Sequence, residues 1–372
     1  MSSSFRKTLL VAALFLACGN SALAMQGGAA ERPNLRSDIA PVADMGTTQG
    51  NGKIVFTLHN PGTTSMFLLR WQTPLDGLTT DLFEVSLNGE PVRYVGAMYK
   101  RGEPTAADYV ELKAGETRTV TVDLGSNYAM TQNGMYEVRF KNRLSDMFGE
   151  RTERNAVRIG AINEVDVTSR SSYLWVDGMQ ASFIRDEALR SSAPVEWTNG
   201  LNASIGYVSC STTRKSALPS ALSQALSYAT NAYNYTNAGT HGARYTTWFG
   251  TYSAANLSTA KTHYNNIKNA LGTQNIVFDC SCTDSGTYAY VYPDQPYKIY
   301  LCGAFWSAPN AGTDSRGGTI VHETSHFTVT AGTDDLAYGQ TAAKALAKKS
   351  PTKALHNADT HEYFSENNPF QN

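Results

Sequence analysis

Two histidines and a glutamate within residues 319–326 are the side chains best suited to chemistry in this chain. His322 and His326 are four residues apart, and Glu323 follows the first histidine directly. On a helix, residues four apart share a face, so both imidazoles can reach one Zn²⁺. Glu323 then projects beside the metal without having to bind it, which suits a general base acting on zinc-bound water. The alternative is a helix whose histidines only cap it or pack.

A third protein ligand must come from outside this helix. A tetrahedral catalytic zinc takes three protein ligands and leaves one position open. The metzincin pattern needs a glycine and a third histidine where this chain has Val329 and Gly332, so that pattern is excluded. Instead, a turn of small residues at 331–333 precedes Asp334 and Asp335. Such a turn can reverse the chain and bring a carboxylate back to the metal.

Together these motifs resemble the aspzincins, the group that contains the deuterolysins and the peptidyl-Lys metalloendopeptidases. The signature of that group is H-E-x-x-H with G-T-x-D-x-x-Y-G, and residues 322–339 match it at every fixed position. The resemblance implies that Asp335 is the third zinc ligand, while Asp334 falls on a variable position. It also implies that Tyr338 donates a hydrogen bond to the developing oxyanion. A tyrosine that only packs is the alternative for Tyr338.

Two carboxylates near the C-terminus indicate substrate specificity. Pro351 suits a helix start, and Asp359 and Glu362 then lie three residues apart on one face, where like charges repel. In peptidyl-Lys metalloendopeptidases, an aspartate and a glutamate at these motif positions form the pocket for the residue after the scissile bond. The resemblance therefore implies cleavage on the amino side of lysine, held by charge-assisted pairing.

Several alternatives to this pocket stay open. The two carboxylates could form a solvated acidic face, or the specificity could be broad, as in deuterolysins. Glu362 could also replace Asp335 as the third zinc ligand. His361, next to Glu362, is expected behind the site or at the surface rather than on the metal.

The N-terminus has the pattern of a secretory signal peptide. Two basic residues precede an apolar run at residues 9–17, and Ala24 ends a small-residue cleavage site, so residues 1–24 are expected to be removed. The run is too short for a permanent membrane anchor. A lipoprotein is the alternative, but Phe15 fits poorly three residues before Cys18. With a formal net charge of −1 and no basic run, we expect a secreted protein without nucleic-acid or membrane partners.

Four cysteines remain after this cleavage: Cys210, Cys280, Cys282 and Cys302. An even number in an exported chain predicts two disulfides, for which three pairings are possible. Cys280 and Cys282 are too close in sequence to bridge each other without strain. The resemblance to the peptidyl-Lys enzymes favours Cys210–Cys280 and Cys282–Cys302. A structural zinc site is the alternative, although paired C-x-x-C motifs are absent.

The elements that must position these residues divide into two halves, as expected for 372 residues. Short alternating runs with Asn-Gly and Pro-Gly turns predict an all-β antiparallel sandwich at about 50–160, loosely like a deuterolysin prosegment. A connector follows at about 161–200. Residues 201–372 are expected to form an α+β, zincin-like catalytic domain, mainly helical with a small hairpin at residues 286–302. Its helices are predicted near 216–233, 258–271, 316–329 and 340–366.

We therefore expect a secreted zinc endopeptidase, binding one Zn²⁺, that is made as an inactive zymogen. Residues 25–200 would be its inhibitory propeptide, or alternatively a permanent substrate-binding domain. No lysine lies between Lys141 and Lys215, so strict lysine specificity would prevent self-release there. Lys100 could plug the lysine pocket. A non-catalytic adhesin or binding protein is the rival function, against which the intact Glu323 and Tyr338 argue; a toxin or virulence role and a nutritional role both stay open.

Overall fold

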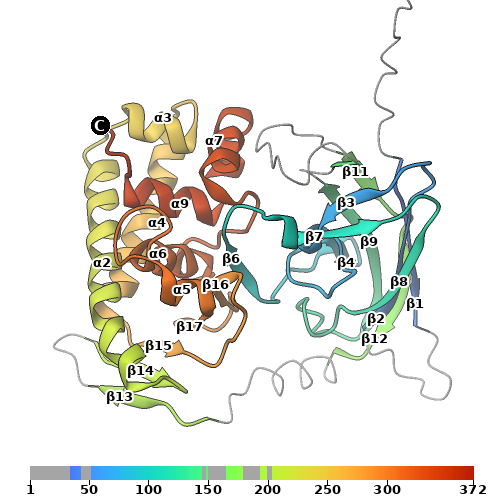
Figure 1. Cartoon of the computed structure of the whole chain (residues 1–372), viewed down its shortest axis with the longest axis horizontal. Coiled ribbons are helices and arrows are strands. Elements are labelled where there is room, and N and C mark those ends of the chain that lie inside the picture. Colours follow the sequence, from blue (N-terminus) through green and yellow to red (C-terminus); the bar gives the residue numbers. More distant parts are fainter. Residues whose placement is uncertain (1–33, 43–51, 145–147, 150–164, 179–192, 199–202) are drawn as a thin grey trace, which may run out of the picture. The chain divides into compact units, whose positions relative to one another are not determined.

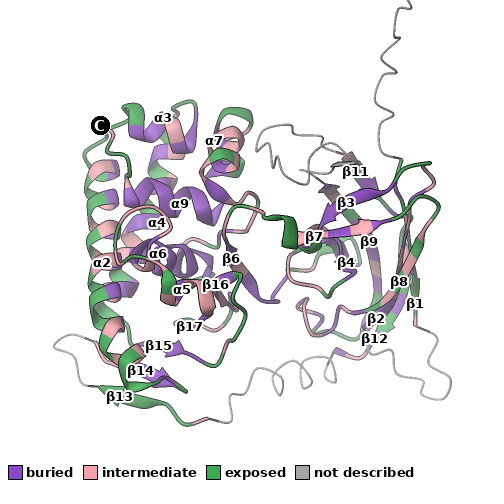
Figure 2. Ribbon diagram, viewed as in Figure 1, coloured by how far each residue is buried: buried purple, intermediate pink, exposed green. Residues whose placement is uncertain are grey.

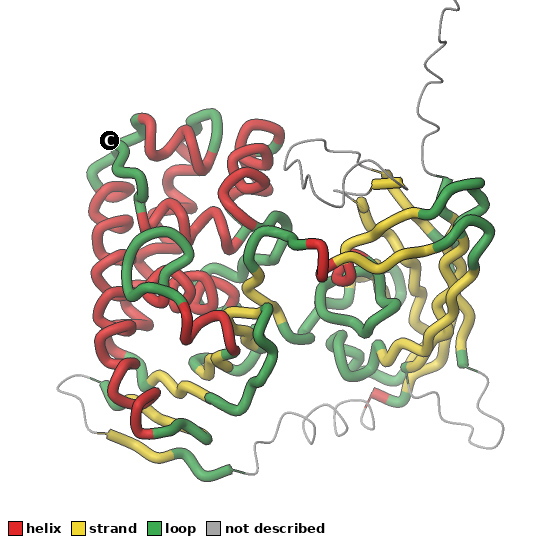
Figure 3. Tube along the Cα trace, viewed as in Figure 1, coloured by secondary structure: helices red, strands yellow, loops and turns green. Residues whose placement is uncertain are grey.

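The computed structural model describes residues 34–42, 52–144, 148–149, 165–178, 193–198 and 203–372 (Figure 1). The expected signal peptide at residues 1–24 lies outside the described residues, as does much of the expected connector. Two hydrophobic cores are present in the described residues, one among the strands of the N-terminal half and one among the helices and strands of the C-terminal half. Figure 3 shows that the long helices belong to the C-terminal half, which also contains short strands.

The N-terminal half is all-β and antiparallel, as predicted. Alternation explains how its strands pack, since Ile54, Phe56 and Leu58 of one strand are fully buried while the residues between them are not. Its strands are β1 (Arg36–Pro41), β2 (Lys53–His59), β3 (Met66–Leu69), β4 (Phe83–Leu87), β5 (Glu90–Pro91), β7 (Tyr109–Leu112), β8 (Thr117–Asp123), β9 (Gly134–Leu144), β10 (Phe148–Gly149), β11 (Val165–Thr168) and β12 (Ser172–Val176), with 3-10 turns η1 (Arg70–Gln72) and η2 (Ala106–Asp108). They form sheets in the orders β1-β2-β8, β10-β3-β7 and β11-β9-β4-β5, with β12 also paired to β9.

This β-rich region is larger than the predicted range of about 50–160. β1 pairs along its whole length with β2, and both β11 and β12 pair with β9. The alternation that marks a strand is present in β12, where Leu174 and Val176 are buried and Trp175 is exposed. The residues assigned to the connector thus include two strands that cover edges of β9, which would otherwise expose unpaired backbone groups.

The C-terminal half contains one mixed sheet of six strands, in the order β13-β14-β15-β17-β16-β6. The predicted hairpin is confirmed as the antiparallel pair β16 and β17, but β14, β15 and β17 are parallel to one another. β6 comes from the N-terminal half and pairs with β16. The strands are β6 (Met98–Arg101), β13 (Glu196–Thr198), β14 (Ile205–Val208), β15 (Ile276–Asp279), β16 (Thr287–Val291) and β17 (Lys298–Leu301).

The predicted helices lie close to their expected positions, with two corrections, and the short helices α3 and α5 were not predicted. They are α2 (Thr212–Asn237), α3 (Ala243–Phe249), α4 (Ala254–Thr273), α5 (Gly303–Ser307), α6 (Arg316–His326), α7 (Gly339–Lys349), α8 (Pro351–Ala354) and α9 (Ala358–Glu366). The helix predicted to end at residue 329 ends at His326, because the backbone of Phe327 is extended. The helix that starts at Pro351 stops at Ala354, and a separate helix, α9, begins at Ala358.

The break between α8 and α9 has a clear cause. The side-chain oxygen of Asn357 accepts hydrogen bonds from the backbone nitrogens of Leu336 and Ala337, both at 2.9 Å. The backbone of Asn357 is itself extended (φ −107°, ψ 125°), so a helix cannot continue through this residue. Asn357 therefore ties the start of α9 to the loop before α7.

The two disulfides are Cys210–Cys280 and Cys282–Cys302, the pairs that the resemblance implied. The first joins the start of α2 to the end of β15, and the second joins the following loop to the end of β17. They close loops of 70 and 20 residues. In the chain-entropy model, each such closure stabilises the fold by about 3–4 kcal/mol.

Candidate metal centre

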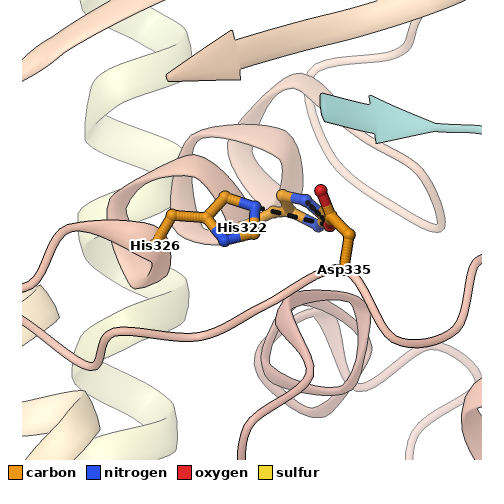
Figure 4. A group of neighbouring side chains, drawn as sticks. All are labelled: His322, His326 and Asp335. Atoms are coloured by element: carbon orange, nitrogen blue, oxygen red, sulfur yellow. Dashed lines mark ion pairs between the residues drawn. The ribbon is translucent and has the colours of Figure 1, made fainter. Parts of the chain in front are cut away.

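The helix α6 brings both histidines of the sequence motif to one point inside the C-terminal half. Ser315 starts the helix by accepting a hydrogen bond from the Gly318 nitrogen at 2.9 Å. His322 and His326 are fully buried, and Nε2 of each points toward Oδ1 of Asp335, at 3.3 and 3.4 Å (Figure 4). Figure 2 shows that α6 and α9 are almost entirely buried.

These three donor atoms fit a tetrahedral zinc. Ligands about 2.0–2.1 Å from a common tetrahedral ion stand about 3.3–3.4 Å apart, which matches both nitrogen–oxygen separations. The Nε2 atoms of His322 and His326 are buried without hydrogen-bond partners. Buried polar atoms are rarely left unpaired, so a shared cation between His322, His326 and Asp335 would account for them.

The second nitrogen of each imidazole, Nδ1, lies next to an oxygen of the protein. Nδ1 of His326 donates to the carbonyl oxygen of Thr333 at 2.7 Å. Nδ1 of His322 lies 3.0 Å from Oδ1 of Asp359 and 3.3 Å from Oε2 of Glu362. Such contacts orient metal-binding imidazoles and leave Nε2 free to bind the ion.

Asp335 is positioned by the turn that follows α6. Gly332 has φ +57°, a conformation that glycine adopts without strain. Backbone hydrogen bonds then fix Asp334, whose nitrogen donates to His356 and whose carbonyl accepts from Ala358. Although burial alone would raise it, the pKa of Asp335 is held well below its usual value by His326 and His322.

His322 also belongs to a second group of possible ligands, with Asp359 and Glu362. This group offers one histidine, and its carboxylates face Nδ1 rather than Nε2. Glu362 is also occupied by a lysine ammonium at 2.7 Å. The His322, His326 and Asp335 group is therefore the better fit for zinc.

The carboxylate of Glu323 lies beside the three candidate ligands and has no partner of its own. Its side chain is fully buried, and both carboxylate oxygens lack hydrogen-bond partners. Burial raises the pKa of Glu323 to about 7, against the opposing effect of His322 and His326. A carboxylate with a pKa near neutrality can both accept and release a proton efficiently.

Tyr338 lies on the loop between Asp335 and α7, and a residue of the N-terminal half contacts it. Nη1 of Arg101 donates to the Tyr338 hydroxyl at 2.7 Å. The next residue, Gly339, donates its backbone N–H to Oδ2 of Asp359 at 2.6 Å. Burial raises the pKa of Tyr338 well above its usual value, so its hydroxyl keeps the proton that it could donate.

A lysine of the N-terminal half is buried beside the two C-terminal carboxylates. Lys100 is fully buried, and its Nζ lies 2.7 Å from Oε2 of Glu362 and 3.2 Å from Oδ1 of Asp314. Burial would lower the pKa of Lys100, but Glu362, Asp359 and Asp314 together raise it well above its usual value. The structure thus places a charged ammonium where the sequence predicted a lysine pocket.

Sequence reasoning missed two members of this cluster. Asp314 lies in the loop before α6 and belongs to no motif; its φ of +51° is visible only in the structure. Arg101 could have been suspected only from its position next to Lys100. Contacts of this kind, between residues more than 200 positions apart, leave no periodic pattern in the sequence.

His361 is buried behind the site rather than at the surface. Burial holds the pKa of His361 well below its usual value, so the ring is neutral. Its Nδ1 donates to the Asn357 carbonyl at 3.0 Å, and its Nε2 accepts from Nδ1 of His263 on α4, also at 3.0 Å. Burial, with a smaller effect of His356, lowers the pKa of His263 to about 4, and burial lowers that of His361 as well.

This histidine pair predicts a loss of stability in acid. The stability contributed by a neutral buried His263 is complete above its unfolded pKa of 6.5 and is lost as the pH falls to about 4. The difference in pKa corresponds to about 3 kcal/mol. Between pH 7 and 4, the free energy of unfolding measured in urea should fall more steeply for the wild type than for His263→Asn. The amide of the variant can still donate to His361. Parallel pH profiles for the two proteins would contradict the prediction.

No helix in the part of the chain that the structure describes has the length and apolar character needed to cross a lipid bilayer.

Several known proteins are similar to this chain. A family model described as lysine-specific metallo-endopeptidase, of the aspzincin M35 group, matches residues 234–366. The chain is 42% identical over 322 residues to a protein named extracellular protease from Aeromonas hydrophila, covering 86% of this chain and 89% of that one. It is 39% identical over 332 residues to a protein named peptidyl-Lys metalloendopeptidase from Grifola frondosa, with the same coverage. A solved zinc peptidase from Grifola frondosa is 53% identical over 44% of this chain and 100% of that chain, with a TM-score of 0.42.

Proposed function

Because the chain belongs to the aspzincin (M35) family of metalloendopeptidases, we propose that it uses zinc to cleave proteins on the amino side of lysine. We further propose that it is exported by a signal peptide at residues 1–24 as an inactive zymogen. Residues 25–200 would be the propeptide and residues 201–372 the catalytic domain. The observation that carries the specificity is the fully buried ammonium of Lys100 against Glu362.

Zinc held by His322, His326 and Asp335 would polarise the scissile carbonyl and lower the pKa of the attacking water. Glu323, whose oxygens are free of other partners, accepts the proton of that water and later passes it to the leaving amine. The hydroxyl of Tyr338 donates a hydrogen bond to the carbonyl oxygen as negative charge builds on it. Each role uses a group that the chain itself supplies.

The strand β6 supports the lysine specificity because it lies as an extended substrate would. It pairs antiparallel with β16, with Lys100 opposite Ala289 and Tyr99 opposite Tyr290. Addition of a strand to a sheet edge is a common way of binding peptides. Lys100 then stands in for the substrate lysine, surrounded by the negative charges of Glu362 and Asp359. The fungal relatives named peptidyl-Lys metalloendopeptidase point to the same residue.

Three consecutive residues of β6 also support inhibition by the N-terminal half. The Tyr99 nitrogen donates to Oδ2 of Asp335 at 2.9 Å, Lys100 fills the pocket, and Arg101 binds the hydroxyl of Tyr338. A third zinc ligand, the specificity pocket and the oxyanion donor are thus all engaged at once. Because no lysine lies between Lys141 and Lys215, release of the propeptide there requires another protease or relaxed specificity.

Sequencing of cleavage products tests the proposed function. The processed enzyme, incubated with a denatured protein rich in lysine and arginine, is expected to produce new N-termini that all begin with lysine. The side chain of arginine is longer and ends in a planar guanidinium, which fits poorly in a pocket that holds an ammonium. Peptide bonds on the amino side of arginine should therefore be cleaved poorly. New N-termini with varied residues would favour broad, deuterolysin-like specificity, and an absence of any cleavage would favour the non-catalytic binding protein.

A further inference from the structure

We propose that Asp314 is a specificity-determining residue, whose carboxylate binds the substrate's lysine ammonium together with Glu362. The inference rests on the proposed function, because it takes the ammonium of Lys100 as the stand-in for the substrate. Neither the sequence motifs nor the matched family description assigns a role to Asp314. It precedes α6, whereas Glu362 belongs to α9, so the two carboxylates approach the ammonium from different elements.

The contacts of the buried ammonium carry the proposal. Nζ of Lys100 donates to Oδ1 of Asp314 at 3.2 Å and lies 2.7 Å from Oε2 of Glu362. The ring of Tyr288 lies 4.8 Å from the same nitrogen, within the range of a cation–π interaction. An ammonium has three donors, and these groups offer it two carboxylates and an aromatic ring.

Asp359 is engaged elsewhere, which leaves a direct role for Asp314. Oδ2 of Asp359 accepts the Gly339 nitrogen at 2.6 Å, and Oδ1 lies 3.0 Å from Nδ1 of His322. Asp359 therefore acts on the ammonium through its charge, while both of its oxygens face other partners. In the described part of the chain, the ion pairs of Lys100 are made with Glu362 and Asp314.

The backbone of Asp314 is held in an uncommon conformation. Its φ of +51° lies in the left-handed region. This conformation costs energy for residues other than glycine, and among those residues Asn and Asp adopt it most often. Two neighbours hold it: Glu366 accepts from the Asp314 nitrogen at 3.2 Å, and the Tyr363 hydroxyl donates to Oδ1 at 2.7 Å. Strain that the surroundings maintain in this way points to a function for the aimed carboxylate.

A second carboxylate also has a physical reason to be there. A buried ion pair with one partner often fails to offset the cost of removing both charges from water. Asp314 adds a further charge-assisted contact, and its side chain keeps 30% of its exposure even with Lys100 in place. A longer guanidinium would have to displace one of these groups. The arrangement therefore selects for a compact ammonium.

The test compares Asp314→Asn with the wild type, each as the full chain cut in the connector. Asparagine tolerates a positive φ and can still accept from Tyr363, so the variant removes charge with little change in shape. Two peptides that differ only in lysine or norleucine after the scissile bond serve as substrates. The expected result is a roughly 10- to 100-fold lower kcat/KM for the lysine peptide, mainly through KM. Cleavage of the norleucine peptide should change less than about twofold. Asp294→Asn, at an exposed position paired with Arg93, is the matched control and should change neither.

Each outcome separates this inference from the proposed function. An equal loss for both peptides would show a merely structural role and overturn the inference, as would an unchanged preference for lysine in the variant. If the wild type itself does not prefer lysine to norleucine, the proposed specificity fails, and the role of Asp314 fails with it.

Discussion

Replacement of Glu323 by glutamine is expected to lower kcat/KM by about 10²- to 10⁴-fold, the range over which a positioned general base contributes. The amide keeps the shape of the side chain but cannot take a proton from water. In the described structure both oxygens of Glu323 are buried and unpaired, so no hydrogen bond is broken by the change. Steady-state kinetics on a lysine peptide with the processed enzyme provides the measurement.

Zinc content is the control that makes this result specific. The proposed ligand atoms on His322, His326 and Asp335 are unchanged in Glu323→Gln, so the variant should bind about one zinc per chain, as measured by elemental analysis. A variant that lost activity together with its zinc would leave the role of the carboxylate unsupported. Casein hydrolysis at the wild-type rate by the zinc-loaded variant would contradict the catalytic assignment outright.

Replacement of Lys100 by alanine is expected to activate the uncut chain. Truncation of one partner of a buried charge pair weakens an interface by about 2–5 kcal/mol, which corresponds to roughly 30- to 4000-fold in affinity. Without the ammonium, Glu362 and Asp314 are left without a cation between them, and the N-terminal half loses its buried ion pairs with the C-terminal half. Hydrolysis of a small lysine peptide by the full-length variant should therefore exceed that of the full-length wild type.

Two controls keep this prediction sharp. Lys141→Ala removes an exposed lysine paired with Glu84, and surface pairs of that kind contribute little, so its uncut chain should stay as inhibited as the wild type. Gel electrophoresis must show that the Lys100→Ala chain is still intact during the assay. If the intact variant is inhibited as strongly as the wild type, Lys100 is not the plug, and the contacts of Tyr99 and Arg101 must account for inhibition.

The elements with local patterns could be predicted closely. The alternation in β2, the helical spacing in α2 and α4, and the hairpin of β16 and β17 all appear in the sequence, because side-chain periodicity reflects which face is buried. The parallel pairing of β14, β15 and β17 could not be read in this way. Helices α2, α3 and α4 separate β14 from β15, and the strand β16 separates β15 from β17. A parallel pair leaves no turn signal between its strands.

The pocket shows the same contrast at single residues. Asp359 and Glu362 lie three apart on one predicted helical face, and the family resemblance implied that they form the pocket. Both oxygens of Asp359 nevertheless face the backbone and a histidine. Asp314 reaches the ammonium of Lys100 across 214 positions of sequence. Which carboxylate contacts an ammonium depends on the tertiary arrangement of several elements, and sequence spacing specifies only one of them.

By itself, the sequence determined the metal-binding motif, the candidate base Glu323 and the family resemblance, because 18 consecutive residues hold all of these at fixed local spacing. It also raised Lys100 as a candidate plug without being able to place it. Only the tertiary structure decided that β6 leaves the N-terminal half to pair with β16, and that Lys100, Asp314 and Arg101 meet the site there. The physical reason is that these contacts join residues far apart in the sequence, whereas local periodicity indicates only which face of a single helix or strand is buried.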